Sequence, residues 1–195
     1  TIIDSSIAKE ARSNRNWDLV YKLIPHMKPY YKIVDLIKTV VNQGIEVAIV
    51  TSSPRPYCEQ ILKHLGITGV ITVCYHDTIN HKPNPEPLLL AVSKMKNQEN
   101  LRIIAVGDEQ NDIIAANNAN IESALACWGN PTAYLLEEVQ PNYYFNDEDS
   151  FLHYCNSFSN INLNIPMYRN KVDNIYHLFN YYPKSRKHDK FSEDI

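Results

Sequence analysis

The feature of this chain that most limits its fold is a regular alternation of short apolar runs with segments of helical spacing. The apolar runs are residues 46–50, 69–74, 101–106, 121–127 and 142–145. The segments with helical spacing lie within 5–43 and at 54–65, 85–96, 109–118 and 131–138. Short, continuous apolar runs are typical of strands buried on both faces. The pattern therefore predicts an α/β fold with a mostly parallel sheet and helices on both faces.

Composition and charge exclude several other classes of protein. The 195 residues are 44% hydrophobic and 21% charged, which is too apolar for a disordered chain. A formal net charge of −3 argues against a nucleic-acid binder that works by bulk electrostatics. No apolar run approaches the roughly 18 residues that a membrane span needs. We therefore expect neither nucleic acid nor a membrane as a partner.

The cysteine pattern argues against a zinc site. Cys58, Cys74, Cys127 and Cys155 show neither CxxC spacing nor histidine partners. They lie within or beside apolar segments, which predicts reduced, small core residues. This use of cysteine favours a cytoplasmic location.

Both ends of the chain look cut, and the alternation stops before the second one. The chain begins at Thr1 as though a strand had just ended, which predicts a fragment of a longer protein. We expect one folded domain over residues 1–159. The pattern predicts that residues 160–195 are a linker followed by the start of a further segment or domain. The alternative is a terminal helix that folds back onto the first domain.

Two polar clusters lie beside predicted elements, one after a strand and one before a helix. Ligands of parallel sheets bind beyond the carboxyl ends of the strands, so both clusters are candidates for a binding site. Thr51, Ser52 and Ser53 follow the first apolar run, where a hydroxyl and backbone N–H groups can hold a phosphate; the alternative is an ordinary helix cap. Lys82 stands among prolines at the start of a helix, which fixes its backbone and makes it a candidate charge for a phosphate or carboxylate.

A pair of acids forms the third polar cluster. Gly107 allows a sharp turn at the end of an apolar run, Asp108 projects from the strand end, and Asp112 lies one helical turn further on. Two carboxylates this close repel each other unless a cation lies between them, and hard oxygen ligands suit Mg²⁺. The alternative is an acid that caps the helix beside an unrelated surface acid.

Taken together, the three clusters resemble motifs of the haloacid dehalogenase-like hydrolase superfamily, in the branch of phosphoglycolate phosphatases. The matching stretches are Ala48-Ile-Val-Thr51, His81-Lys-Pro-x-Pro-x-Pro87 and Val106-Gly-Asp-x-x-x-Asp-Ile113, the last followed by Ala115-Ala116. The resemblance covers roughly residues 1–155. It implies a Rossmann-like fold and a Mg²⁺-dependent hydrolase of small phosphomonoesters that works through an aspartyl-phosphate.

The resemblance also assigns a role to each residue that matches its motifs. Thr51 and the Ser52 backbone would hold the transferring phosphoryl group, and Lys82 would neutralise it and position the nucleophile. Asp108 would bind Mg²⁺, and Asp112 would support the metal site directly or through water. Asn111 would point toward the phosphate.

One family motif is missing from the chain. The family's first motif, Asp-x-Asp-Gly-Thr, follows the central strand and carries the nucleophile and the general acid/base. Thr1 matches its last residue, so both catalytic aspartates and the first, central strand would lie upstream. Residues 5–32 would form a short helical cap, from which Arg12, Arg15, Trp17 or Tyr21 could contact substrate.

Two other kinds of domain are alternatives to an active phosphatase. A non-catalytic domain of a larger protein could keep the same sheet and phosphate pocket. A dinucleotide-binding domain is disfavoured because no GxGxxG follows a strand. A nucleotide, a sugar phosphate and phosphoglycolate all remain open as substrates.

Overall fold

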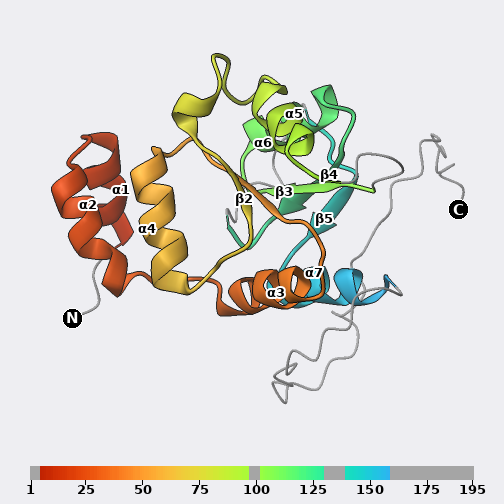
Figure 1. The fold of residues 1–195 in the computed structure, drawn as a ribbon, viewed down its shortest axis with the longest axis horizontal. Coiled ribbons are helices and arrows are strands. Elements are labelled where there is room, and N and C mark those ends of the chain that lie inside the picture. The colour runs from red at the N-terminus through yellow and green to blue at the C-terminus, as the bar shows by residue number, and fades with distance from the viewer. Residues whose placement is uncertain (1–4, 97–101, 130–138, 159–195) are drawn as a thin grey trace, which may run out of the picture.

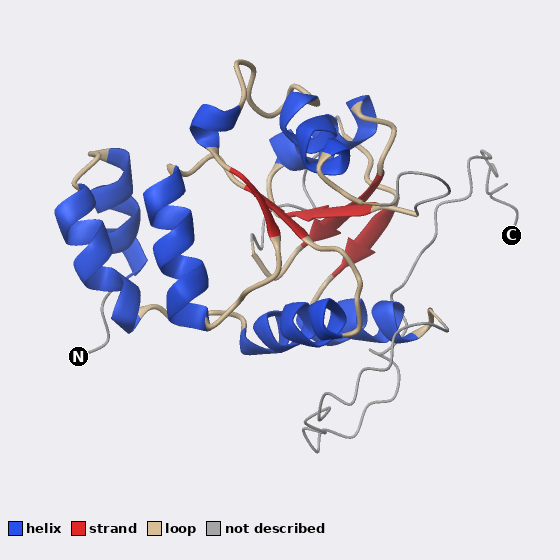
Figure 2. Cartoon of the chain, in the orientation of Figure 1, coloured by secondary structure: helices blue, strands red, loops and turns tan. Residues whose placement is uncertain are grey.

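The structure is a computed structural model that describes residues 5–96, 102–129 and 139–158. Every strand pair in this part of the chain is parallel. Helices lie on both sides of the strands, with α5 and α6 on one side and α3 and α7 on the other (Figures 1 and 2). The predicted α/β class is therefore confirmed. The expected helix at 131–138 and the segment 160–195 lie outside the described residues.

The first helical segment is divided into several pieces. Helix α1 (Ser5–Ser13), helix α2 (Trp17–Leu23) and a single 3₁₀ turn (Ile24–His26) precede helix α3 (Tyr31–Asn42). Asn16 begins α2, because its side-chain oxygen accepts a hydrogen bond from the Leu19 backbone N–H at 3.3 Å. Figure 1 shows α1 and α2 beside α4 at the edge of the molecule, with α4 between them and the strands.

The first sheet has two parallel strands. Strand β1 (Ala48–Val50) pairs with strand β2 (Ile71–Val73), and helix α4 (Arg55–Leu65) connects them. Gly66 ends α4 in the left-handed conformation at φ 64°, which glycine adopts without steric cost. This helical crossover places the carboxyl ends of β1 and β2 next to each other, with Val50 opposite Val73.

The second sheet has three parallel strands in the order of the chain. Strand β3 (Ile104–Gly107) pairs with β4 (Glu122–Ala126), which pairs with β5 (Tyr143–Phe145). The helices that accompany these strands are α5 (Glu86–Ser93), α6 (Gln110–Asn118) and α7 (Glu148–Asn156). Helix α6 packs on both β3 and β4, which the small, fully buried Ala115 and Ala116 allow.

The described strands do not form one continuous sheet, because β1 and β3 are not hydrogen-bonded to each other. The sequence pattern predicted strands buried on both faces. Instead, all three residues of β1 are only half-buried, and Val106 of β3 is 41% exposed. The apolar side chains of β1 and β3 are therefore less buried by the described residues than their sequence predicts.

The core lies between the second sheet and helices α3 and α7. Phe145 is 1% exposed and its ring lies 5.1 Å from that of Phe151 and 5.2 Å from that of Tyr154, measured between centroids. Leu36 and Val40 of α3 belong to the same cluster. The four cysteines are buried and unpaired, as predicted.

In the part of the chain that the structure describes, no helix has the length and the apolar character that crossing a membrane requires.

We predict that Phe145→Ala destabilises the fold by about 3–5 kcal/mol, because it removes a buried ring at the centre of an aromatic cluster and leaves a cavity. Chemical denaturation followed by circular dichroism measures the effect. Tyr31→Ala is the matched control, since Tyr31 is 67% exposed and its loss should change stability little. Equal destabilisation by the two substitutions would contradict this account of the core.

Candidate functional site

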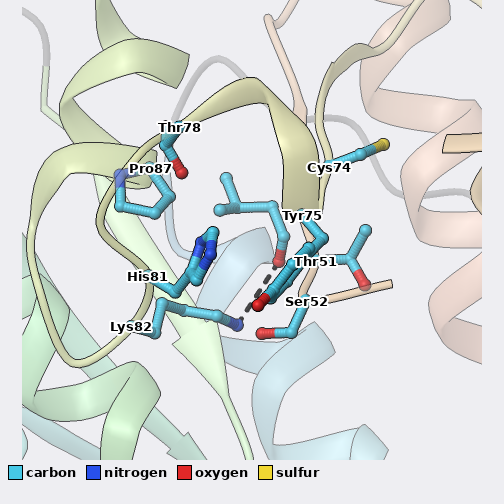
Figure 3. Close-up of a pocket in the computed structure, with 9 residues that line it drawn as sticks. Thr51, Ser52, Cys74, Tyr75, Thr78, His81, Lys82 and Pro87 are labelled. Carbon is cyan, nitrogen blue, oxygen red and sulfur yellow. Dashed lines mark hydrogen bonds between the residues drawn. The ribbon is translucent and has the colours of Figure 1, made fainter. Parts of the chain in front are cut away.

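A small pocket lies at the carboxyl ends of β1 and β2 (Figure 3). Parallel α/β sheets bind their ligands at this end of their strands. The pocket is lined by Val50, Thr51, Ser52, Cys74, Tyr75, Thr78, His81, Lys82 and Pro87. It therefore brings together the first two polar clusters that the sequence singled out.

The turn after β1 is not a helix cap. The Thr51 hydroxyl oxygen accepts a hydrogen bond from the Ser53 backbone N–H at 3.1 Å, and the Thr51 backbone N–H donates to the Val73 carbonyl at 2.9 Å. Helix α4 begins at Arg55, and its N-cap residue, Pro54, makes no side-chain hydrogen bond. The hydroxyl cluster thus builds a tight turn at the pocket, and the exposed Ser52 stands at its tip.

Lys82 connects the two sheets. Its ammonium group lies 2.5 Å from Asp112 Oδ1 and 3.5 Å from the Val50 carbonyl oxygen at the end of β1. The Lys82 side chain is only 17% exposed. In Figure 3 the Lys82 ammonium and the Ser52 hydroxyl point into the same part of the pocket. This is a fixed positive charge next to a turn that carries hydroxyl groups.

The two acids of the third cluster have different environments. Asp112 Oδ1 faces Lys82, while Asp112 Oδ2 accepts a hydrogen bond from the Glu109 backbone N–H at 3.2 Å. Among the described residues, nothing forms a hydrogen bond or an ion pair with the Asp108 carboxylate. Asn111 lies exposed in the first turn of α6 and has no recorded contact with the pocket. Its proposed role in phosphate binding stays a prediction.

Gly107 makes the approach of Asp112 possible. A β-carbon at position 107 would lie 2.3 Å from the Asp112 β-carbon and 2.6 Å from its carboxyl carbon. Any larger residue at the end of β3 would therefore displace Asp112 from Lys82. The glycine is required here for close packing.

The described residues fit Mg²⁺, with the Asp108 carboxylate as the available ligand. No cluster of three or more potential metal ligands occurs within residues 5–96, 102–129 and 139–158. Mg²⁺ needs fewer protein ligands, since it keeps several waters and is commonly bound by one or two carboxylates together with substrate phosphates. Because both oxygens of Asp112 already have partners, Asp108 would be the better direct ligand.

Sequence analysis missed the interaction that fixes the wall of the pocket. Asp77 Oδ2 accepts a hydrogen bond from the Cys74 backbone N–H at 2.8 Å and also pairs with Arg55 at the start of α4. The Cys74 hydrogen bond, aided by the Arg55 charge, lowers the pKa of the Asp77 carboxyl. The neighbouring Tyr75 ring stacks on His81, with centroids 3.9 Å apart. An acid three residues after Cys74, the end of an apolar run, was the available signal.

The candidate cap residues pack against helix α4. The Arg12 guanidinium donates to the Tyr57 hydroxyl at 3.4 Å, and the Trp17 ring lies 6.0 Å from the Tyr57 ring and 6.4 Å from that of Tyr21. Arg15 lies exposed in the turn between α1 and α2, at φ 54°. None of these contacts brings a cap side chain to the pocket, so their role in substrate binding stays a prediction.

Comparison with known proteins gives consistent matches. The family model for haloacid dehalogenase-like hydrolases matches residues 5–126. A putative pyrophosphatase PpaX of Caldanaerobacter subterraneus is 32% identical over 124 residues, which cover 60% of this chain and 56% of that protein. A phosphoglycolate phosphatase of Pectobacterium atrosepticum is 30% identical over 115 residues, or 58% of this chain and 49% of that protein. The chain spans about half the length of the curated relatives that it matches.

A solved structure supports the fold. A putative phosphoglycolate phosphatase from Lactobacillus plantarum superposes with a TM-score of 0.57 at 24% identity, over 77% of this chain and 72% of that chain. At this level of identity the match is evidence for the fold alone.

We predict that Asp77→Ala destabilises the protein by about 2 kcal/mol, because it leaves the buried Cys74 N–H without its acceptor. Glu59→Ala is the matched control: Glu59 also pairs with Arg55, but at 3.7 Å and 61% exposed, so its loss should matter little. Urea denaturation measures both variants. Equal loss of stability in both would show that the Cys74 hydrogen bond is unimportant.

The contribution of Asp77 to the free energy of unfolding depends on pH, and the direction of this dependence follows from its lowered pKa. Since the folded-state pKa of Asp77 is lowered, its stabilisation is complete above the ordinary carboxyl pKa of 3.8. It is lost as the pH falls from there through the lowered folded value. The stability difference between the wild type and Asp77→Ala should therefore shrink in acid.

Proposed function

This chain belongs to the haloacid dehalogenase-like hydrolase family, in the branch similar to phosphoglycolate phosphatases, and on that premise we propose that it is the phosphate-binding part of a Mg²⁺-dependent phosphatase. The observation that carries the proposal is the convergence of Lys82 with the Thr51–Ser52 turn and Asp112. A phosphoryl group needs positive charge and hydrogen-bond donors placed in advance, and this corner supplies both.

Each residue has a distinct part in this proposal. The Thr51 hydroxyl and the Ser52 backbone hold the phosphoryl oxygens, and the Lys82 ammonium neutralises their charge. Asp112 keeps the Lys82 ammonium at the end of β1 by pairing with it from α6. Asp108 holds Mg²⁺, and the bound ion supplies further positive charge against the phosphoryl oxygens.

The nucleophile and the general acid/base come, in this proposal, from aspartates upstream of Thr1. Their strand occupies the space between β1 and β3, where it pairs with both. Three observations support this placement: the two strands are not paired with each other, Val106 is 41% exposed, and the β1 residues are only half-buried. An aspartate at the end of such a strand would lie between Lys82 and Asp108, where an aspartyl-phosphate has to form.

The substrate in this proposal is a small phosphorylated metabolite. Relatives are named as a pyrophosphatase and a phosphoglycolate phosphatase, so the shared chemistry is the phosphoryl group. Residues 1–159 form the hydrolase domain and 160–195 lead toward a further segment. A cytoplasmic location is supported by the four unpaired, buried cysteines.

The direct test is hydrolysis of p-nitrophenyl phosphate by the full gene product, with and without Mg²⁺. The proposal predicts turnover that EDTA abolishes and that added Mg²⁺ restores. Turnover that persists after complete chelation would reject the metal requirement. Phosphate binding without any turnover would favour the non-catalytic alternative.

We predict that Asp108→Asn lowers kcat/KM by on the order of 10²-fold or more, because it removes the direct metal ligand. Asp112→Asn should cost about tenfold, because Asp112 acts through the orientation of Lys82. Lys63→Ala, an exposed change on α4, is the control and should have no effect. Steady-state kinetics over a Mg²⁺ series measure all three, and a reversed order of the two acids would show that their roles are exchanged.

The strand between β1 and β3 can be tested separately. We predict that Val106→Asp destabilises the full gene product by several kcal/mol, roughly the cost of burying an unpaired carboxylate. Ile79→Asp is the control, since Ile79 is 89% exposed and lies away from the gap in the loop before α5. Thermal unfolding decides between the possibilities: if both variants unfold like the wild type, Val106 faces solvent and no strand covers it.

A further inference from the structure

The turn after β4 lies against the Asp108 carboxylate. A β-carbon at Gly129 would stand 2.7 Å from the Asp108 β-carbon, 2.8 Å from Oδ2 and 3.0 Å from the carboxyl carbon. These distances are too short for any carbon to occupy, and they involve the base of the Asp108 side chain as well as its tip. Rotation of the carboxylate alone would therefore not relieve the clash.

The turn that carries Gly129 is itself held on several sides. The Cys127 backbone N–H donates to the Phe145 carbonyl at 2.9 Å, and the Gly129 N–H donates to the Ala126 carbonyl at 3.1 Å. The Trp128 ring packs on Phe151 at 5.9 Å between centroids. Because the backbone is fixed in this way, a larger residue at 129 would displace Asp108 before it displaced the turn.

A distant tyrosine completes this support. The Tyr30 hydroxyl donates a hydrogen bond to the Trp128 carbonyl oxygen at 2.9 Å, across 98 residues of sequence. Tyr30 is the residue before α3, where the chain leaves the two N-terminal helices. The peptide that joins Trp128 to Gly129 is thus fixed from the start of α3, and Gly129 in turn bounds the space that Asp108 can occupy.

We propose that Gly129 and Tyr30 are positioning residues for Asp108, Gly129 by direct packing and Tyr30 through the Trp128 carbonyl. The inference rests on the proposed function, in which Asp108 holds Mg²⁺. Neither residue is one to which the proposed function assigns contact with substrate or metal. Their effect is to limit the Asp108 carboxylate to one place at the end of β3, so that less freedom is lost when the ion binds.

The test is the Mg²⁺ affinity of the full gene product, measured by isothermal titration calorimetry without substrate. Gly129→Ala should raise the Kd for Mg²⁺ about tenfold, the usual effect of disturbing the support of a metal ligand. Tyr30→Phe should raise it by a smaller factor, about fivefold, because it removes one hydrogen bond. Tyr31→Phe is the matched control: it changes the adjacent, 67% exposed tyrosine and should leave the Kd unchanged.

A kinetic split separates positioning from general damage. With Tyr30→Phe, saturating Mg²⁺ should restore wild-type kcat, and the thermal midpoint should stay close to that of the wild type. Tyr30→Phe also decides the question if Gly129→Ala fails to fold. Wild-type Mg²⁺ affinity in Tyr30→Phe and in any folded Gly129→Ala protein would overturn this inference and leave the proposed function intact. No Mg²⁺ binding by the wild type would overturn the proposed function and this inference with it.

Discussion

The ion pair between Lys82 and Asp112 is the contact on which the arrangement of the site depends. It joins a loop that follows the first sheet to helix α6, which follows the first strand of the second sheet, across strands β1 and β3 that do not pair with each other. Both side chains are largely shielded from water, at 17% and 18% exposed. Removing one partner would leave a poorly solvated charge, which is costly, whereas the intact pair adds little net stability. Its main effect is to fix where the ammonium lies.

Two glycines set the positions of the two acids around this pair. Gly107 lets Asp112 approach the end of β3, and Gly129 leaves room for Asp108. Neither glycine is recorded with a positive φ, so both are needed for space and not for an unusual backbone. The result is a division of labour between acids only four positions apart. Asp112 is occupied by Lys82 and a backbone N–H, while Asp108 keeps its carboxylate available.

The sequence pattern predicted the parts of this structure that depend on local order. Apolar runs located the strands to within a few residues, and the polar clusters around Thr51 and Lys82 were brought to one pocket. The burial of a strand by distant parts of the chain could not be predicted from local sequence order. The gap beside Val106 depends on which strands become neighbours, and periodicity carries no information about that.

Polar contacts between side chains and backbone groups were also not predicted from the sequence. The Asp77 carboxylate binds a backbone N–H and Arg55, and Tyr30 reaches the Trp128 carbonyl. A backbone group has no sequence signature, so a side chain that binds one looks like any surface residue. Arg12 and Trp17 give a second example: their contacts with Tyr57 of α4 could not be read from the sequence, and their role in substrate binding stays a prediction.

The most direct measurement of the central claim is a crystal structure of the full gene product with Mg²⁺ and beryllium fluoride, a phosphoryl mimic. We expect an upstream strand paired with both β1 and β3, and the fluoride complex on an aspartate at its carboxyl end. Lys82 and Thr51 should contact the fluorines, and Asp108 should ligate the metal. Direct pairing of β1 with β3, or a fluoride complex bound away from Lys82, would contradict it.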